Sequence, residues 1–347
     1  MRILHILKHC VRGNGHVHVA VDLACEQAAR GHEVFFVSGG GTYVPLLTSY
    51  NVRHYEFKQD PFGLLLGIYP FFRMMIRERP DIVHAHMMAS AGIAFFVTRI
   101  IKCPLITTVH NSFDSHSEIM RLGDRVVAVS NSEEKLLIDR GYDPNQLSMV
   151  YNGPIDSIRD KLITDNPITI TNPFIVTLSG LHRRKRVNDA LSAFAKVHKK
   201  FPDWRFVVVG SGPDEFKLKS HCQFLSIQDK VIFAGAIFNP KSILQQAQIF
   251  MALSEAEPFG LVVAEARASS CAIVVSNVGG MPEVLDSGEA GIIVDLGNVD
   301  AAAQALIALM GDKSVLDHWQ KAAFIGSGKF SVSAMADGYD KVYASTL

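Results

Sequence analysis

The sequence lacks paired cysteines, an excess of charge of either sign and any long apolar run. Its 5 cysteines stand far apart, with no Cys-x-x-Cys spacing, at positions 10, 25, 103, 222 and 271. This pattern fits neither a disulfide framework nor a zinc site, and it favours a reducing cytosol. Basic and acidic residues number 34 each, so no global charge attracts nucleic acid or an anionic membrane. Anion binding must therefore come from local clusters.

No segment reaches the ~18 uninterrupted apolar residues of a spanning helix. The nearest approach runs from Phe62 to Arg79 and is interrupted by Pro70. We expect Pro70 to divide it into a short apolar segment and an amphipathic helix, which either packs on the core or rests on a membrane surface. The first residues, MRILHILKH, indicate a strand and not a signal peptide. We expect a cytoplasmic protein, with peripheral contact at the inner face of the membrane permitted.

The chain of 347 residues is too long for one core, since single cores stop growing near ~250 residues. Short apolar runs alternate with helical patterns, as in parallel α/β folds. The expected strands are 3–7, 33–38, 81–85, 105–109, 125–129, 174–179, 205–210, 230–234, 249–253, 272–276 and 292–294. The pattern predicts an α/β fold of two doubly wound, Rossmann-like domains that face each other across a cleft. Open sheets of this kind bind ligands beyond the carboxyl ends of their strands.

The loop RGNGHVHV follows the first expected strand and opens a helix. Gly13 and Gly15 would let the backbone approach a ligand, and amides at a helix start favour a phosphate or carboxylate. The loop is not Gly-x-Gly-x-x-Gly, because His18 holds the third position, and Ser38 stands where an acid would bind a ribose. Both features weaken an interpretation as a nicotinamide site. A tight turn without a ligand remains open.

The run SGLHRRKRV places four cations in succession after a strand: Arg183, Arg184, Lys185 and Arg186. Adjacent cations repel one another, so an anion in the predicted cleft would offset the repulsion. A pyrophosphate leaving group needs such charges when no metal is present. A solvated basic surface is the alternative. We find no Asp-x-Asp and no metal spacing, and therefore expect no metal cofactor.

The stretch SEAEPFGLVVAEA puts Glu257 in a loop and Glu265 on the helix that follows. Eight helical steps would separate them by ~12 Å, whereas the carboxylates of a retaining hydrolase lie ~5 Å apart. Direct glycosidase chemistry by this pair is therefore disfavoured. One carboxylate near a sugar and one near a ribose would fit an extended nucleotide sugar. Two surface glutamates remain the structural alternative.

Two further loops combine glycine and proline at expected strand ends, around Gly210 and Gly212 and around Gly279 and Gly280. Such loops form anion cradles at helix starts, although turn chemistry alone could explain each. Among 14 histidines, His84 and His86 alternate at a strand end and His16 and His18 stand at the first helix start. Neither pair forms an i, i+4 helical couple with a nearby acid, as a metal site would favour. His110 ends a strand at the predicted cleft. It is either a core or capping residue, or a group that bonds a sugar hydroxyl or steers a proton.

Taken together these motifs resemble the family 4 glycosyltransferases, retaining enzymes of the two-Rossmann GT-B architecture. The resemblance spans nearly the whole chain, through NGHVHVAVDLA, ARGHEV, DIVHAH, TTVHN, VVAVSNSEE, VYNGPID, VVVGSGPDE, SEAEPFGLVVAEA and SNVGGMPEV. The Glu-x7-Glu stretch with its internal Phe-Gly is the most specific of them. The resemblance implies an acceptor-side domain at 1–160, a nucleotide-sugar domain at 161–329 and a terminal helix at 330–347 that crosses back to the first domain.

The resemblance also implies roles for individual residues. His110 would contact the transferred sugar, Lys185 the pyrophosphate and Glu257 the donor sugar, which makes these three the catalytic candidates. Glu265 would grip the ribose. The residues expected to bind the donor are Gly15, Arg184, Gly212, Phe259, Gly260, Leu261, Glu265, Gly279 and Gly280.

The chain departs from the family pattern at three places. The usual Gly-Arg-Leu before the basic run is Ser179-Gly180-Leu181 here, so a partner arginine must be Arg183 or Arg184 or be missing. The small turn after the second glutamate reads Ser270-Cys271-Ala272, and Asn14 replaces the first of two glycines near the start. These changes bear on donor geometry and on the acceptor contact, but none removes a reacting group.

The expected function is a retaining hexosyltransferase that moves a hexose-type sugar from a UDP- or GDP-sugar to a saccharide or lipid-linked hydroxyl acceptor. Synthesis of a cell-surface polysaccharide or lipid-linked oligosaccharide is the expected setting, and no nucleic acid is involved. Two alternatives stay open: a nucleotide-sugar epimerase or hydrolase of the same fold, and a non-catalytic sugar-nucleotide binding protein.

Overall fold

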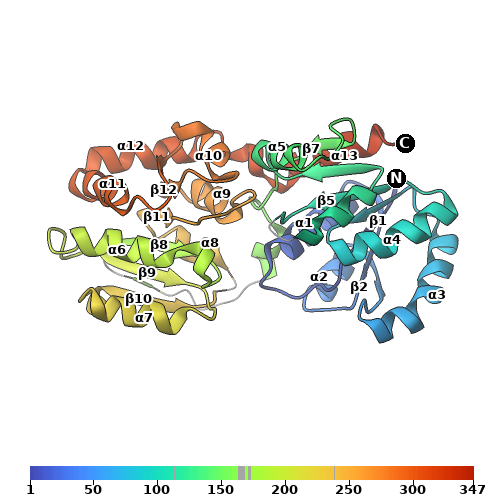
Figure 1. Cartoon of the computed structure of the whole chain (residues 1–347), viewed down its shortest axis with the longest axis horizontal. Coiled ribbons are helices and arrows are strands. Elements are labelled where there is room, and N and C mark those ends of the chain that lie inside the picture. Colours follow the sequence, from blue (N-terminus) through green and yellow to red (C-terminus); the bar gives the residue numbers. More distant parts are fainter. Residues whose placement is uncertain (113–114, 163–168, 171–172, 238) are drawn as a thin grey trace. The chain divides into compact units, whose positions relative to one another are not determined.

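The computed structural model describes residues 1–112, 115–162, 169–170, 173–237 and 239–347. The contacts divide the chain into two compact units. Unit 1 comprises Met1–Lys161 and Lys329–Leu347, and unit 2 comprises Leu162–Gly328. Each unit is built on one parallel sheet (Figure 1), as in the Rossmann-like architecture expected from the alternating sequence pattern.

The sheet of unit 1 has the strand order β3-β2-β1-β4-β5-β6-β7, and all its pairs are parallel. The strands are β1 (Arg2–Ile6), β2 (Glu33–Ser38), β3 (Arg53–Glu56), β4 (Ile82–Ala85), β5 (Leu105–Val109), β6 (Arg125–Ala128) and β7 (Leu147–Met149). The order reverses between β1 and β4, which is the topological switch point where open sheets bind ligands.

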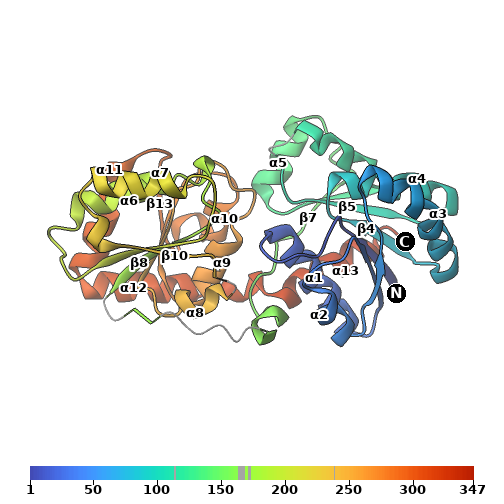
Figure 2. The same cartoon turned by 90° about the horizontal axis from the view of Figure 1, so that it is seen from below.

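The helices of unit 1 cover both faces of this sheet. They are α1 (Gly15–Ala29), α2 (Val44–Ser49), α3 (Pro61–Glu78), α4 (Met88–Ile101), α5 (Asn131–Asp139) and α13 (Val332–Ala344), with short 3-10 helices η1 (Ser115–Leu122) and η2 (Ile158–Leu162). Alternation along β2 shows the two faces, because Phe35 packs into the core under α3 and α4 while Phe36 packs under α1 and α2. The C-terminal helix α13 lies beside α1 within unit 1 (Figures 1 and 2).

The segment around Pro70 differs from the expectation, because α3 continues through the proline from Pro61 to Glu78. Pro70 is exposed, so water can bond the carbonyl four residues earlier that loses its amide partner. Asp60 caps the N-terminus of this helix, since its side chain accepts a hydrogen bond from the amide of Gly63 at 2.9 Å. No helix in the described part of the chain is both long and apolar enough to cross a bilayer.

Unit 2 has the strand order β10-β9-β8-β11-β12-β13, again with all its pairs parallel. The strands are β8 (Phe174–Leu178), β9 (Arg205–Val209), β10 (Val231–Gly235), β11 (Ile249–Ala252), β12 (Ala272–Ser276) and β13 (Ile292–Val294). Its switch point lies between β8 and β11, so the loops that follow these two strands define its candidate site.

The helices of unit 2 follow the same alternation. They are α6 (Val187–Val197), α7 (Glu215–Phe224), α8 (Pro240–Leu244), α9 (Leu261–Ala268), α10 (Met281–Val284), α11 (Val299–Gly311) and α12 (Lys313–Phe324), with 3-10 helices η3 (Arg183–Lys185), η4 (Gln228–Lys230), η5 (Asp286–Gly288) and η6 (Ser327–Phe330). Helices α6 and α11 pack together over one face of the sheet, and α12 packs against both α11 and α9.

Candidate functional site

Four loops of unit 2 meet at the carboxyl edge of its sheet because parallel strands all end on the same side. Backbone hydrogen bonds join each loop to its neighbour. The amide of Leu181, after β8, donates to Ser211 after β9 at 2.9 Å. The amide of Glu255, after β11, donates to the carbonyl of Arg184 at 2.8 Å, and the amide of Gly280, after β12, donates to Glu257 at 3.0 Å. These bonds make the four loops one platform.

Lys185 and Glu257 form an ion pair on this platform. Lys185 ends η3, Glu257 lies in the loop after β11, and the two loops flank the switch point. Their side chains are 17% and 22% exposed, so each is held by its surroundings but can still reach a ligand. The structure thus brings together the cation and the acid that the sequence placed 72 residues apart.

The positive charge of the basic turn, residues 183–186, is partly neutralised by acidic side chains of the protein itself. Glu257 pairs with Lys185, while Arg186 contacts Asp189 at 2.6 Å and Glu255 at 3.9 Å. Repulsion among the four cations therefore does not by itself require a bound anion. The stronger argument is the position of Lys185 at the switch point, where a ligand is expected on grounds of topology.

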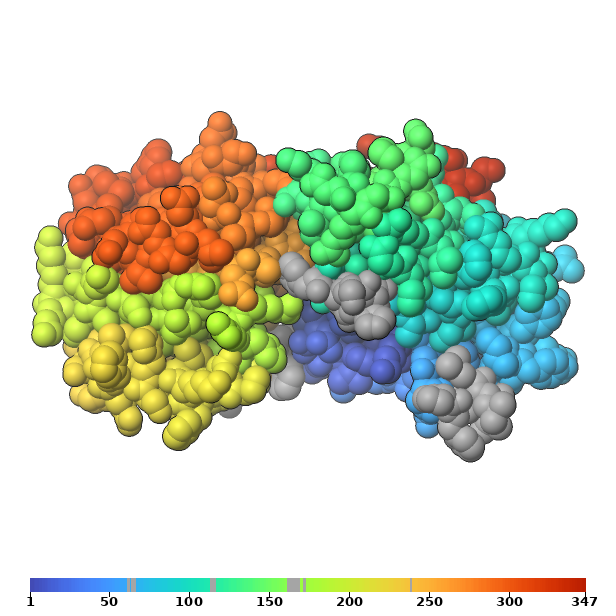
Figure 3. All heavy atoms as spheres, in the orientation of Figure 1, coloured from blue at the N-terminus to red at the C-terminus, as the bar shows by residue number. Residues whose placement is uncertain are grey.

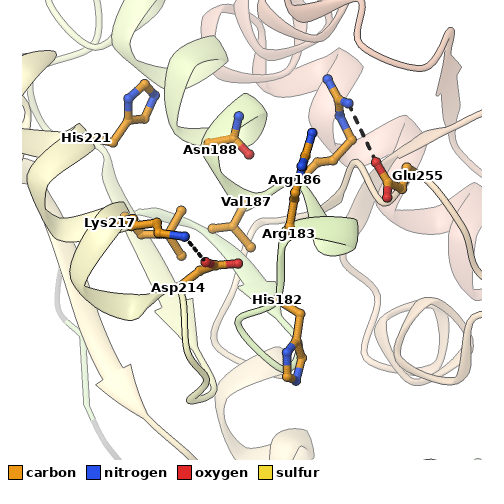
Figure 4. A pocket seen from close by; sticks show the side chains of 10 residues that line it. His182, Arg183, Arg186, Val187, Asn188, Asp214, Lys217, His221 and Glu255 are labelled. Carbon is orange, nitrogen blue, oxygen red and sulfur yellow. Dashed lines mark hydrogen bonds and ion pairs between the residues drawn. The ribbon is translucent and has the colours of Figure 1, made fainter.

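A cavity of about 540 Å³ opens beside this turn, between η3 and α7 (Figure 4). Its charged walls include Arg183, Arg186 and Lys217. Glu255 pairs with Arg186, and Asp214 pairs with Lys217. Among the residues lining it are also His182, Asn188 and His221. Lys185 and Glu257 do not line this cavity, so it lies next to the ion pair and does not enclose it.

Gly279 and Gly212 have structural reasons to be glycine. Gly279 has φ +54, and a Cβ there would lie 1.9 Å from the carbonyl oxygen of Glu257. A Cβ at Gly212 would lie 2.5 Å from the carbonyl of Leu181. Both glycines let neighbouring loops of the platform approach closely. The amide of Gly280 is already bonded to Glu257, so this glycine positions the loop that carries the acid.

The motif around the second glutamate is placed as the sequence indicated. Gly260 is the N-cap of α9, Leu261 begins the helix, and Glu265 lies half-buried one turn later. Phe259 is buried at 2% exposure, so its ring anchors the loop. Arg184 lies exposed on η3. The ligand contacts assigned to these residues stay predictions.

In unit 1, Gly15 begins α1 and His110 follows β5 at the carboxyl edge of the sheet. The ring of His16 has its centroid 6.2 Å from that of His110. Burial, with a smaller contribution from His16, lowers the pKa of His110 to about 3. His110 is therefore neutral at pH 7 and can accept a hydrogen bond.

Sequence reasoning missed Arg267, whose side chain is fully buried at 0% exposure. Its guanidinium donates to three carbonyls, those of Ala323, Val284 and Ile325, at 2.5–2.8 Å. It also pairs with Asp286 at 2.9 Å. Arg267 thereby fastens α9, which carries Glu265, to the end of α12. The sequence gives no signal of this, because the partners are carbonyls that any residue offers.

Two family descriptions match successive parts of the chain. Residues 13–155 match Glycosyltransferase Family 4, and residues 158–325 match Glycosyl transferases group 1. The chain is a glycosyltransferase of the family 4, group 1 type. The expected fold class is confirmed as well, since the two parallel-sheet units match solved structures of this architecture over nearly the whole chain.

The glycosyltransferase has curated relatives with established names. It is 28% identical over 328 residues to the N-acetyl-alpha-D-glucosaminyl L-malate synthase of Bacillus anthracis, covering 86% of this chain and 84% of that protein. It is 26% identical over 268 residues to the gpi3 component of the phosphatidylinositol N-acetylglucosaminyltransferase of Schizosaccharomyces pombe, covering 71% of this chain and 56% of that protein. The structure of Anabaena HepE in complex with UDP-glucose matches with a TM-score of 0.83 and 18% identity, covering 99% of this chain and 100% of that one.

Proposed function

We propose that this glycosyltransferase moves a hexose-type sugar from a nucleotide diphosphate sugar to a hydroxyl acceptor with retention of anomeric configuration. The observation that carries the proposal is the Lys185–Glu257 ion pair at the switch point of unit 2. A cation and a carboxylate on neighbouring loops suit the two parts of such a donor. The ammonium would face the diphosphate, and the carboxylate would accept hydrogen bonds from sugar hydroxyls.

The donor class is supported by the relatives as well. Anabaena HepE is seen with UDP-glucose. The names of the two curated relatives contain N-acetyl-alpha-D-glucosaminyl and N-acetylglucosaminyltransferase. We propose a UDP-sugar as the first donor to test and a GDP-sugar as the second. The acceptor is proposed to be a saccharide or a lipid-linked hydroxyl.

In the proposed step, the acceptor oxygen bonds to the anomeric carbon on the face from which the diphosphate leaves. The bond from that carbon to the phosphate oxygen breaks, and the acceptor proton passes to the departing phosphate oxygen. Lys185 stabilises the growing negative charge, and removing one such donor typically costs ~3 kcal/mol of transition-state energy. Glu257 holds the sugar, and Glu265 is proposed to hold the ribose.

The test follows transfer from UDP- and GDP-sugars to candidate acceptors and determines the anomeric configuration of the product by NMR. The proposal expects retained configuration and a loss of kcat of about 100-fold or more in Lys185→Ala and in Glu257→Ala. Arg205→Ala, on β9 away from the ion pair, serves as the control. An inverted product, or full activity in both site variants, would contradict the mechanism.

The same assay separates the two alternatives. A nucleotide-sugar hydrolase or epimerase would release free sugar or an isomerised donor when no acceptor is present. A non-catalytic binding protein would bind the donor but would show no turnover with any acceptor.

We also propose peripheral membrane contact through an apolar and basic surface of α3 and α4, called the α3/α4 surface here. Its exposed apolar side chains are Ile68, Tyr69, Ile76, Phe96 and Ile100. Arg73, Arg99 and Lys102 are exposed on the same two helices or at their ends. Figure 3 shows this part of unit 1 in light blue and cyan. Apolar side chains bordered by cations suit an anionic bilayer surface, where a lipid-linked acceptor would be presented.

A further inference from the structure

A chain of hydrogen-bonded imidazoles runs through the sheet of unit 1 and ends at His110. His5 on β1 and His84 on β4 are register partners, and His86 follows His84 at the period of two that keeps side chains on one face. These rings lie on the face that α1 and α13 cover, and all three are fully buried at 0% exposure. A buried polar group must find partners, so the bonds among these rings decide where their protons lie.

The distances trace one continuous path. His5 Nε2 lies 2.8 Å from Gln27 Oε1 on α1, and His5 Nδ1 lies 2.9 Å from His86 Nε2. His86 Nδ1 lies 3.2 Å from His110 Nε2. The path therefore links an amide on α1 to the edge of the sheet through three imidazoles.

The rings on this path are neutral at pH 7. Burial lowers the pKa of His5 to about 4 and that of His110 to about 3, and it holds the pKa of His86 well below its ordinary value. A neutral imidazole has one N–H donor and one acceptor nitrogen. Along such a path the direction of the first hydrogen bond therefore fixes the direction of all the others.

Gln27 sets that first direction, because its oxygen accepts from His5 Nε2. The nitrogen end of the same amide lies 3.4 Å from the hydroxyl of Tyr343, which lies 2.7 Å from His84 Nδ1. With its proton on Nε2, His5 accepts from His86 at Nδ1. His86 in turn accepts from His110 at Nδ1, which leaves the proton of His110 on Nε2. His110 Nδ1 has no hydrogen-bond partner among the described residues.

We propose that Gln27, His5 and His86 are positioning residues that hold His110 with its proton on Nε2, so that Nδ1 accepts a hydrogen bond from a hydroxyl of the bound sugar. The arrangement gives the contact a direction: His110 can take a hydroxyl donor but cannot itself donate, since its only N–H is committed to His86. A donor sugar that lacks this hydroxyl, or carries fluorine there, would lose the bond.

The ring nitrogens of His5, His84 and His86 are better suited to these hydrogen bonds than to binding a metal ion. The donor nitrogens of His5, His84 and His86 lie within 4.8 Å of one another. Each of the six ring nitrogens already has a partner, however, because His84 bonds Tyr343 and Thr108, both at 2.7 Å. An ion would have to displace several of these bonds, whereas the tautomer chain leaves all of them in place.

The proton positions can be tested without any activity, by ¹⁵N NMR of the full chain labelled at histidine. The shifts of Nδ1 and Nε2 distinguish the two tautomers, and loss of signals in His110→Gln assigns the ring. The proposal expects the Nε2–H form in the wild type at pH 7.5. Gln27→Leu and His5→Phe each remove one link, and each is expected to populate the Nδ1–H form of His110.

Thr108→Val is the matched control. It removes a hydrogen bond to His84 in the same core, off the path to His110, so it is expected to lower stability without changing the tautomer of His110. A Nδ1–H wild type, or a tautomer unchanged in both Gln27→Leu and His5→Phe, would overturn the proposal.

The activity arm rests on the proposed function. Losing one hydrogen bond to the sugar should lower kcat/KM by about tenfold in Gln27→Leu. Among deoxyfluoro donors, the one altered at the contacted hydroxyl should be used equally well by wild type and variant. A full tenfold loss with every such donor would overturn the contact. If the tautomers behave as expected but no transfer occurs, the proposed function fails and the tautomer chain stands.

Discussion

Acidification should destabilise unit 1, because buried and half-buried histidines of this unit resist protonation in the folded state. Burial lowers the pKa of His5 and His16 to about 4, and that of His18 and His110 to about 3. In the unfolded chain each has its ordinary pKa of ~6.5. Below pH 6.5 the unfolded state therefore binds more protons, and the free energy of unfolding falls as the pH falls.

The size of this loss of unfolding free energy follows from the difference between the pKa values in the folded and unfolded states. At pH 5 the medium lies ~1.5 units below the unfolded pKa and still above the folded values, so each ring costs about 2 kcal/mol. The cost at this pH is set by the unfolded pKa, since all four folded values lie lower. Four rings sum to about 8 kcal/mol, which is comparable to the whole stability of a domain at ~5–15 kcal/mol. Unit 1 should therefore lose much of its stability between pH 7.5 and pH 5.

The two units can be followed separately, because both tryptophans, Trp204 and Trp319, lie in unit 2. Urea unfolding at pH 7.5 and pH 5 would be recorded by tryptophan fluorescence for unit 2 and by far-UV circular dichroism for both units. We expect the circular dichroism transition to split at pH 5, with the fluorescence transition at the higher urea concentration. His16→Asn should reduce the acid-induced loss by about 2 kcal/mol. A unit 1 equally stable at both pH values would refute the reasoning.

Two further predictions concern the scaffold and the surface. Arg267→Met should lower the free energy of unfolding of unit 2 by about 3 kcal/mol, because it leaves three buried carbonyls and Asp286 without their donor; urea titration of tryptophan fluorescence measures this. The double variant Phe96→Ser, Ile100→Ser should weaken sedimentation with anionic phospholipid vesicles without changing the melting temperature, since both side chains are exposed. Equal sedimentation of the variant and the wild type would count against the α3/α4 surface.

Much of the fold could be predicted from the sequence because buried parallel strands are continuous apolar runs. The missed strands, Arg53–Glu56 and Leu147–Met149, are short edge strands. The first is mostly polar and has no buried residue, so no hydrophobic pattern marks it. The helix through Pro70 was wrongly divided, because the sequence does not show that the proline faces water.

The candidate site was predictable to the extent that it depends on topology. Parallel strands place Lys185 and Glu257 at the same edge, and the ion pair between them confirms that these two residues meet. The histidine network could not be anticipated in full. The bond between His84 and Tyr343 spans 259 residues, and it forms only because the last helix packs on the first unit. In the sequence, only the spacing of two between His84 and His86 indicated that histidines gather on one face of the sheet.

The central claim is that Lys185 and Glu257 in unit 2 hold a nucleotide diphosphate sugar. Calorimetric titration with UDP, GDP and ADP, and with their sugars, measures this directly, with Lys185→Ala and the control Lys313→Ala tested alongside the wild type. Lys313 is an exposed lysine of α12 that does not line the cavity beside the ion pair. The account predicts saturable binding of one of these nucleotides that weakens at least tenfold in Lys185→Ala and little in Lys313→Ala. Failure of every nucleotide to bind, or equal affinity in wild type and Lys185→Ala, would contradict it.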